Sequence, residues 1–379
     1  MNLPPVVPVA RNVGAWLFQR KTDSPAVSAR RVVVRSAALA TALLIVACAS
    51  MPAPPYAVEI PVGVSDGRAR FTEIFCSVLK ERGTTLPDYR PCAEALSKLE
   101  AQPRGDGRPV DLGPSRSGLQ AYVVPGIGYA CIAQWLQSSA MAGEHLARQG
   151  FDVHALDVDP LSGTAKNAGQ IRDAIMAMPQ EVGLPRVVLF GYSKGTPDVL
   201  EAVVRYPELQ QRVAAVVSVA GAVGGSPLAD DATQWEADMF RLWPKAGCDS
   251  GDGGAVASLR PEVRKAWLAG NSLPPTIRFY SVVTLPDGDH LSAILRPTYQ
   301  KLARINPRND GQMIYSDQII PGSTLLGFLN ADHWAVAIPV DRTHRVIGST
   351  FVNHNDYPRE ALLEALLRYV EEDLSAVRR

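Results

Sequence analysis

Short apolar segments rich in valine recur along the chain from about residue 119 onward, and amphipathic segments separate several of them. The apolar segments span residues 119–124, 151–158, 186–190, 213–220, 276–283 and 325–330. Their lengths are typical of strands, whereas residues 133–148 and 197–206 have apolar side chains at helical spacing. Strands that alternate with helices predict an α/β fold, in which a mostly parallel sheet has helices on both faces.

The region ahead of these strands has a different pattern. Residues 71–82 and 92–102 show short helical patterns, and there is little strand signal between residues 56 and 115. Residues 49–55 are rich in proline and predict a short tether. We therefore expect residues 48–115 to form a tether and an N-terminal helical extension that packs on the main domain, which spans residues 116–379.

Composition fits one globular domain with appendages, because 46% of the 379 residues are hydrophobic and 20% are charged. The formal net charge is zero, but the first 47 residues carry six basic side chains and one acidic one. The rest of the chain is therefore slightly acidic. It contains no basic stripe with interleaved aromatic residues, so no nucleic-acid partner is expected.

Residues 36–47 are apolar and follow Arg30, Arg31 and Arg35, which is the layout of a secretory signal peptide. The apolar segment is shorter than the roughly 20 residues of a membrane span. It ends in Ile-Val-Ala-Cys48, which resembles the lipobox of bacterial lipoproteins. That resemblance implies a signal peptide over residues 1–47 and a mature chain that begins at an acylated Cys48.

The lipoprotein resemblance implies export and anchoring to a bacterial membrane, on the periplasmic or cell-surface side. A polar lead of about 35 residues departs from the lipoprotein pattern and suggests that translation starts later than Met1. A plain signal peptide with an incidental cysteine is the alternative interpretation.

Four cysteines remain after Cys48, namely Cys76, Cys92, Cys131 and Cys248. An even number of cysteines in an exported protein suggests disulfide bonds, and four cysteines allow three pairings. Cys76 and Cys92 are close in sequence within the helical extension, so we expect them to pair, which leaves Cys131 with Cys248. Four free buried thiols remain the alternative.

Gly191-Tyr-Ser193-Lys-Gly195 is a G-x-S-x-G motif. A predicted strand precedes it and a predicted helix follows it. A sharp strand-to-helix turn exposes the serine hydroxyl and places the Lys194 N–H at the start of the helix, where it can bind an oxyanion. In this context the sequence resembles the α/β-hydrolase family over residues 116–379, which implies that Ser193 is the nucleophile. A glycine-serine turn without chemistry is the alternative.

The second oxyanion donor is expected in the loop after the first parallel strand. Val124-Pro-Gly-Ile-Gly128 occupies that place and resembles the family's oxyanion loop. By its position, the N–H of Ile127 is the predicted donor.

The family's chain order is nucleophile, acid and then histidine, which excludes His145 and His154 because both precede Ser193. His333 follows the last predicted strand, where the family has its histidine, and is the predicted general base. His354 is the second candidate. His344 and His290 are interpreted as solvated loop residues.

Asn309-Asp-Gly311 resembles the turn that carries the acid in many lipases of the family, so Asp310 is the predicted acid. Such a carboxylate fixes the tautomer of the imidazole and stabilises its charged form. Asp317 competes for this role, as do Asp287 and Asp289. The neighbour of His333, Asp332, is expected to point outward.

An insertion at about residues 222–275 separates two predicted strands, at a place where family members have a cap over the nucleophile. Its large apolar residues could line a substrate pocket or form a small core of their own; they are Trp235, Met239, Phe240, Leu242, Trp243 and Trp267. The glycine-rich residues 250–254 lack the ligand spacing of an EF-hand, so no metal site is expected. The side chains suffice for the chemistry, so no cofactor is expected either.

These features favour a serine hydrolase of lipase or esterase type, which cleaves small-molecule or lipid carboxylic esters through an acyl-enzyme. An acyltransferase or a thioesterase would use the same triad. A non-catalytic, lipid-anchored binding protein on a hydrolase scaffold is the alternative from another class. It would require that Ser193, His333 and Asp310 fail to converge.

Overall fold

The computed structural model describes residues 55–131, 139–179, 186–231 and 251–377. The described residues belong to one compact unit of the chain. The predicted signal peptide, Cys48 and most of the tether lie outside the described residues. So do the central residues 232–250 of the insertion, which include Cys248.

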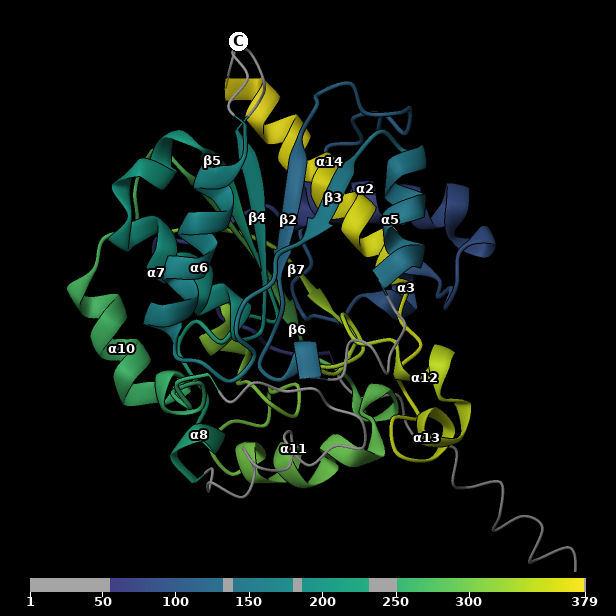
Figure 1. Ribbon diagram of the computed structural model, residues 1–379. Coiled ribbons are helices and arrows are strands. Elements are labelled where there is room, and N and C mark those ends of the chain that lie inside the picture. Colours follow the sequence, from purple (N-terminus) through teal and green to yellow (C-terminus); the bar gives the residue numbers. More distant parts are fainter. Residues whose placement is uncertain (1–54, 132–138, 180–185, 232–250, 378–379) are drawn as a thin grey trace, which may run out of the picture. The chain divides into compact units, whose positions relative to one another are not determined.

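Seven parallel strands form a single sheet in the order β1-β7-β6-β5-β4-β2-β3 (Figure 1). The strands are β1 Ser65–Asp66, β2 Gln120–Val124, β3 Asp152–Ala155, β4 Val187–Tyr192, β5 Val213–Val219, β6 Arg278–Thr284 and β7 Thr324–Leu329. All pairings are parallel, as the sequence pattern predicts. The α/β-hydrolase fold class is confirmed.

The helices lie on both faces of the sheet. They are α2 Arg68–Arg82, α3 Cys92–Ala95, α5 Ser139–Arg148, α6 Thr164–Ala177, α7 Gly195–Arg205, α8 Leu228–Asp231, α10 Pro261–Gly270, α11 Arg296–Ala303, α12 Val340–Thr343, α13 Arg345–Thr350 and α14 Arg359–Val377. Apolar side chains of α2, α5 and α14 pack in one cluster with one face of the sheet. Those of α6 and α7 pack with the opposite face.

The N-terminal region differs from the sequence-based expectation at two points. Ser65 and Asp66 form a short edge strand beside β7, which no strand signal indicated. The second helical pattern, 92–102, is helical only as far as Ala95. The chain is extended there because β7 and the loop after β6 bind it: the Ser97 amide donates to the Phe328 carbonyl at 3.0 Å and its hydroxyl to the Leu285 carbonyl at 2.7 Å.

One predicted disulfide is present. Cys76 of α2 and Cys92 of α3 are bonded, with 5.2 Å between their Cα atoms. Cys131 is also disulfide-bonded, but its predicted partner Cys248 lies outside the described residues, so that pairing stays a prediction. Across the described ranges, no helix has both the length and the apolar character needed to cross a membrane.

A buried carboxylate joins three helices on one face of the sheet. Glu364 of α14 lies 2.7 Å from His145 Nε2 of α5, 2.8 Å from Arg368 Nε and 2.9 Å from Arg82 Nε of α2. Burial tends to raise the pKa of Glu364, but the hydrogen bonds from His145 and Arg368 and the charges of Arg368 and Arg82 outweigh it, so the pKa is lowered. His145 therefore has a structural role, away from the catalytic residues.

Replacing Glu364 by Gln should reduce the free energy of unfolding by about 3 kcal/mol at pH 7, because it leaves buried cations without their counter-charge. A lowered folded-state pKa stabilises the fold above the unfolded pKa, which is 4.5 for Glu, and that stabilisation is lost as the pH falls through the folded value. The difference between variant and parent in urea unfolding should therefore shrink below about pH 4.5.

The matched control is Glu372→Gln on the same helix, whose side chain is 36% exposed and pairs with Arg70. Its loss should stay below about 1 kcal/mol. Equal losses for the two variants would contradict the role given to Glu364.

Candidate active site

The turn between β4 and α7 holds Ser193 in a left-handed backbone conformation, with φ of 52°. This conformation is uncommon for a residue other than glycine and is the one that a nucleophile elbow requires. The flanking glycines are needed for space. A Cβ atom on Gly191 would lie 2.5 Å from the Thr196 Cα, and one on Gly195 would lie 2.1 Å from the Val124 carbonyl oxygen.

Three side chains from separate segments meet at this turn. His333, on the loop after β7, has its Nε2 2.8 Å from Ser193 Oγ. Its Nδ1 lies 2.7 Å from Asp310 Oδ2. The His333 amide also donates to the Asp310 carbonyl at 3.0 Å, so the two loops are joined through their backbones. All three side chains are buried.

Asp310 is held by further donors from its surroundings. Its Oδ1 accepts the amides of Gln312 at 2.8 Å and Met313 at 2.6 Å. Its Oδ2 accepts the hydroxyl of Thr284, at the end of β6, at 2.5 Å and the amide of Gln318 at 3.3 Å. These contacts fix the carboxylate opposite the histidine. Thr284 and Gln318 carry no motif, and the sequence analysis did not identify them.

The rival acids lie elsewhere. Asp287 bonds to His290, and within the described chain Asp317 and Asp289 form no hydrogen bond to His333. Burial raises the pKa of Asp317. Burial lowers the pKa of His354, with the positive charge of His290 adding to the effect. The interpretation of His290 as a solvated residue is wrong in part. Its side chain is only 21% exposed, and its ring bonds to Asp287.

The position of Asp332 differs from the one expected from the sequence. It does not point outward but is fully buried, and its carboxylate accepts the amides of Ser292, Trp334 and Ala335 at 2.9, 3.0 and 2.9 Å. Burial raises its pKa against the effect of these hydrogen bonds. The carboxylate turns inward because the chain bends sharply after His333 and leaves backbone amides that need an acceptor.

Tyr192 contacts His333 through both its hydroxyl and its ring. Its hydroxyl donates to the His333 carbonyl at 2.7 Å, and the two ring centroids are 5.4 Å apart. Burial, with the negative charges of Asp310 and Asp332, raises the pKa of Tyr192 well above its usual value. The phenol therefore stays protonated and remains a donor.

The two predicted oxyanion donors are backbone amides of segments next to Ser193. The Lys194 amide stands at the N-terminus of α7, and the Ile127 amide belongs to the loop after β2. That loop touches the nucleophile, because a Cβ on Gly126 would lie 3.0 Å from the Ser193 Cβ. Within the described residues neither amide donates to another protein atom. Both are therefore available to a ligand oxygen.

The described parts of the insertion contain α8 and α10. Of its large apolar residues, only Trp267 falls within them. Its indole N–H donates to Glu201 of α7, and the guanidinium of Arg264 lies 4.6 Å from its ring centroid. Trp267 thus attaches α10 to the domain. The other five large apolar residues of the insertion lie outside the described residues.

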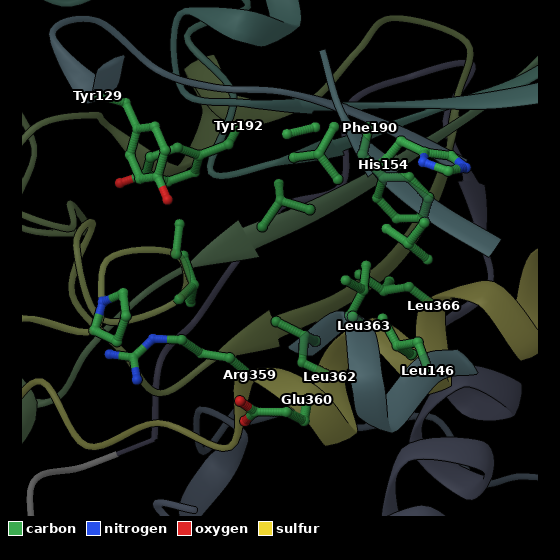
Figure 2. A pocket seen from close by; sticks show the side chains of 18 of the residues that line it. Tyr129, Leu146, His154, Phe190, Tyr192, Arg359, Glu360, Leu362, Leu363 and Leu366 are labelled. Carbon is green, nitrogen blue, oxygen red and sulfur yellow. The ribbon is translucent and has the colours of Figure 1, made fainter. Parts of the chain in front are cut away.

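A cavity of about 240 Å³ lies between the sheet and α5 and α14. Figure 2 shows that leucines of α5 and α14 line one part of it, while Tyr129 and Tyr192 lie at another. Ser193, His333 and Asp310 do not line it. Over the described residues, no group of three or more His, Cys, Asp or Glu side chains could hold a metal ion.

Comparison with known proteins places this arrangement in a family. No protein-family model matches the chain, and comparison with curated proteins also finds no match. Among solved structures, the crystal structure of the metagenomic carboxyl esterase MGS0156 is 39% identical. The match covers 84% of this chain and 96% of that one, with a TM-score of 0.76.

The Staphylococcus hyicus lipase has a similar fold at 12% identity, with a TM-score of 0.50 over 71% of this chain and 100% of that one. The identity and coverage of the first match go beyond a likeness of fold. The chain therefore belongs to the α/β-hydrolase-fold carboxyl esterase family that MGS0156 represents.

Proposed function

We propose that the protein is a serine hydrolase that cleaves carboxylic esters through an acyl-enzyme. The observation that carries the proposal is the continuous hydrogen-bonded series from Ser193 Oγ through His333 to Asp310, at 2.8 and 2.7 Å. The relation to a carboxyl esterase supports it independently.

In this mechanism His333 Nε2 takes the proton of Ser193 as Oγ attacks the acyl carbon. Asp310 keeps the Nδ1 proton in place and stabilises the imidazolium. The amides of Lys194 and Ile127 bind the oxyanion. His333 then protonates the leaving alcohol, and water attacks the acyl-enzyme with His333 again as base.

The substrates expected for this site are small-molecule or lipid esters. Transfer of the acyl group to an alcohol, or cleavage of a thioester, would use the same residues. A binding protein without catalysis is disfavoured, because the three side chains do converge.

We further propose that the chain is exported and anchored to a bacterial membrane through Cys48, so that residues 48–115 link the anchor to the main domain. The lipobox-like sequence carries this proposal, and the Cys76–Cys92 disulfide supports an oxidising compartment. Ala49 after Cys48 would favour the outer membrane in a two-membrane bacterium.

Replacing Ser193 or His333 by Ala should reduce kcat for p-nitrophenyl butyrate by at least about 10⁴-fold, because the nucleophile and its base act as a unit. A fluorophosphonate probe should label the parent and fail to label Ser193→Ala. A folded parent that neither turns over nor labels would contradict the proposed function.

Asp310→Asn should lower kcat by roughly 10³–10⁴-fold, because the amide cannot hold the required histidine tautomer. Asp317→Asn is the matched control, since Asp317 does not contact His333, and its kcat should stay within about threefold of the parent. If Asp317→Asn had the larger effect, the acid would be misassigned.

Cells that express the full chain should incorporate radiolabelled palmitate into it, whereas the Cys48→Ser chain should stay unlabelled and leave the membrane fraction. Equal labelling of both chains would exclude the anchor at Cys48.

A further inference from the structure

The residue that follows the nucleophile in the chain forms a buried ion pair. The Lys194 ammonium donates to both carboxylate oxygens of Asp198, at 2.8 and 2.7 Å. Both residues are 1% exposed. Lys194 therefore contributes two groups: its amide is the proposed oxyanion donor, and its ammonium pairs with Asp198 in the first turn of α7.

Asp198 is a junction between three helices. Asn167 of α6 donates to its Oδ2 at 2.7 Å. The guanidinium of Arg264 on α10 also attracts the Asp198 carboxylate. The same guanidinium attracts Glu201. Burial raises the pKa of Asp198, and Lys194 is the strongest opposing influence. The carboxylate therefore serves the packing of α7 and depends on Lys194 for its charge.

The same carboxylate belongs to the first turn of α7, the helix whose N-terminal amide is the proposed oxyanion donor. Asp198 is four residues beyond Lys194, a rise of about 6 Å along a helix. An unpaired negative charge at such a distance, in a site from which water is largely excluded, would oppose the negative charge that develops on the substrate oxygen.

We propose that the Lys194 ammonium cancels the charge of the Asp198 carboxylate and thereby keeps the oxyanion site free of opposing negative charge. This inference rests on the proposed function. It makes the Lys194 side chain a positioning residue that acts through Asp198, distinct from the donor role of its amide. The pair Lys194–Asp198 then joins the packing of three helices to the chemistry at Ser193.

The test is a double-mutant cycle on the full chain with p-nitrophenyl butyrate. Lys194→Met keeps the side-chain volume but leaves Asp198 unpaired, so kcat should fall roughly tenfold, with KM within about twofold, at a pH high enough to ionise Asp198. The loss should shrink as the pH falls and the unpaired carboxylate is protonated. Adding Asp198→Asn should then restore kcat at least about threefold over Lys194→Met, because the second charge is also removed. A purely structural ion pair would lower the free energy of unfolding of Lys194→Met, but kcat per fluorophosphonate-labelled site would not depend on pH in this way.

Inhibition by phenylboronic acid provides a second readout, since its adduct on Ser193 is a negatively charged tetrahedron. Its Ki should rise roughly tenfold in Lys194→Met and fall back in the double variant. Lys301→Met is the control, because Lys301 pairs with Asp231 at the surface and its side chain is 47% exposed. It should leave kcat and Ki unchanged.

A double variant no faster than Lys194→Met would overturn the inference. So would a double variant that does not fold, since buried ion pairs can usually be replaced by neutral residues without large cost and a failure would show that the pair serves the fold itself. If Lys194→Met alone does not fold, Lys194→Gln replaces it in the cycle, because its amide can still donate to Asp198 without a charge. A folded Lys194→Gln chain as fast as the parent would overturn the inference. An inactive, unlabelled parent would overturn the proposed function instead.

Discussion

The left-handed backbone of Ser193 is the constraint on which the arrangement around it depends. It persists because neighbouring segments hold it from several sides. The Ser193 amide donates to the Val219 carbonyl at 3.2 Å, and the Ser193 carbonyl accepts the amides of Thr196 and Ala222 at 3.1 and 3.0 Å. Ala220, at the end of β5, also has a positive φ, of 49°. Both residues directly follow or end adjacent strands, and the hydrogen bonds of Ser193 to Val219 and Ala222 join the two turns.

Much of this arrangement could be predicted from the sequence. The strands that surround the motif are short valine-rich segments, and β2, β4, β5, β6 and β7 lie within a few residues of the expected positions. The family's chain order leaves few candidates for the histidine and favours His333, and the Asn309-Asp-Gly311 turn favours Asp310. The geometry around them agrees with those assignments, since the order of strands in a parallel sheet brings their C-terminal ends to one edge.

What could not be predicted depends on contacts between distant segments. The extended backbone after Ala95 reflects hydrogen bonds to β7 and the loop after β6, which no local pattern reveals. Asp332 was expected outside because adjacent side chains usually diverge, yet free amides in the following turn draw its carboxylate inward. The junctions at Glu364 and Asp198 also depend on which helices come together in the folded chain. At these two junctions the sequence indicates only the i,i+4 pairs, Lys194 with Asp198 and Glu364 with Arg368.

The edge strand β1 has a consequence for how this protein can be shortened. An exposed sheet edge offers unpaired backbone groups to other chains, and β1 occupies the edge of β7 with only two residues. The same segment continues into α2, whose apolar residues belong to the main core. A fragment that began at residue 116 would contain every residue of the proposed reaction. It would lack β1, the strand that pairs with the edge of β7. It would expose a strand whose next loop carries His333, and self-association through that edge would compete with activity.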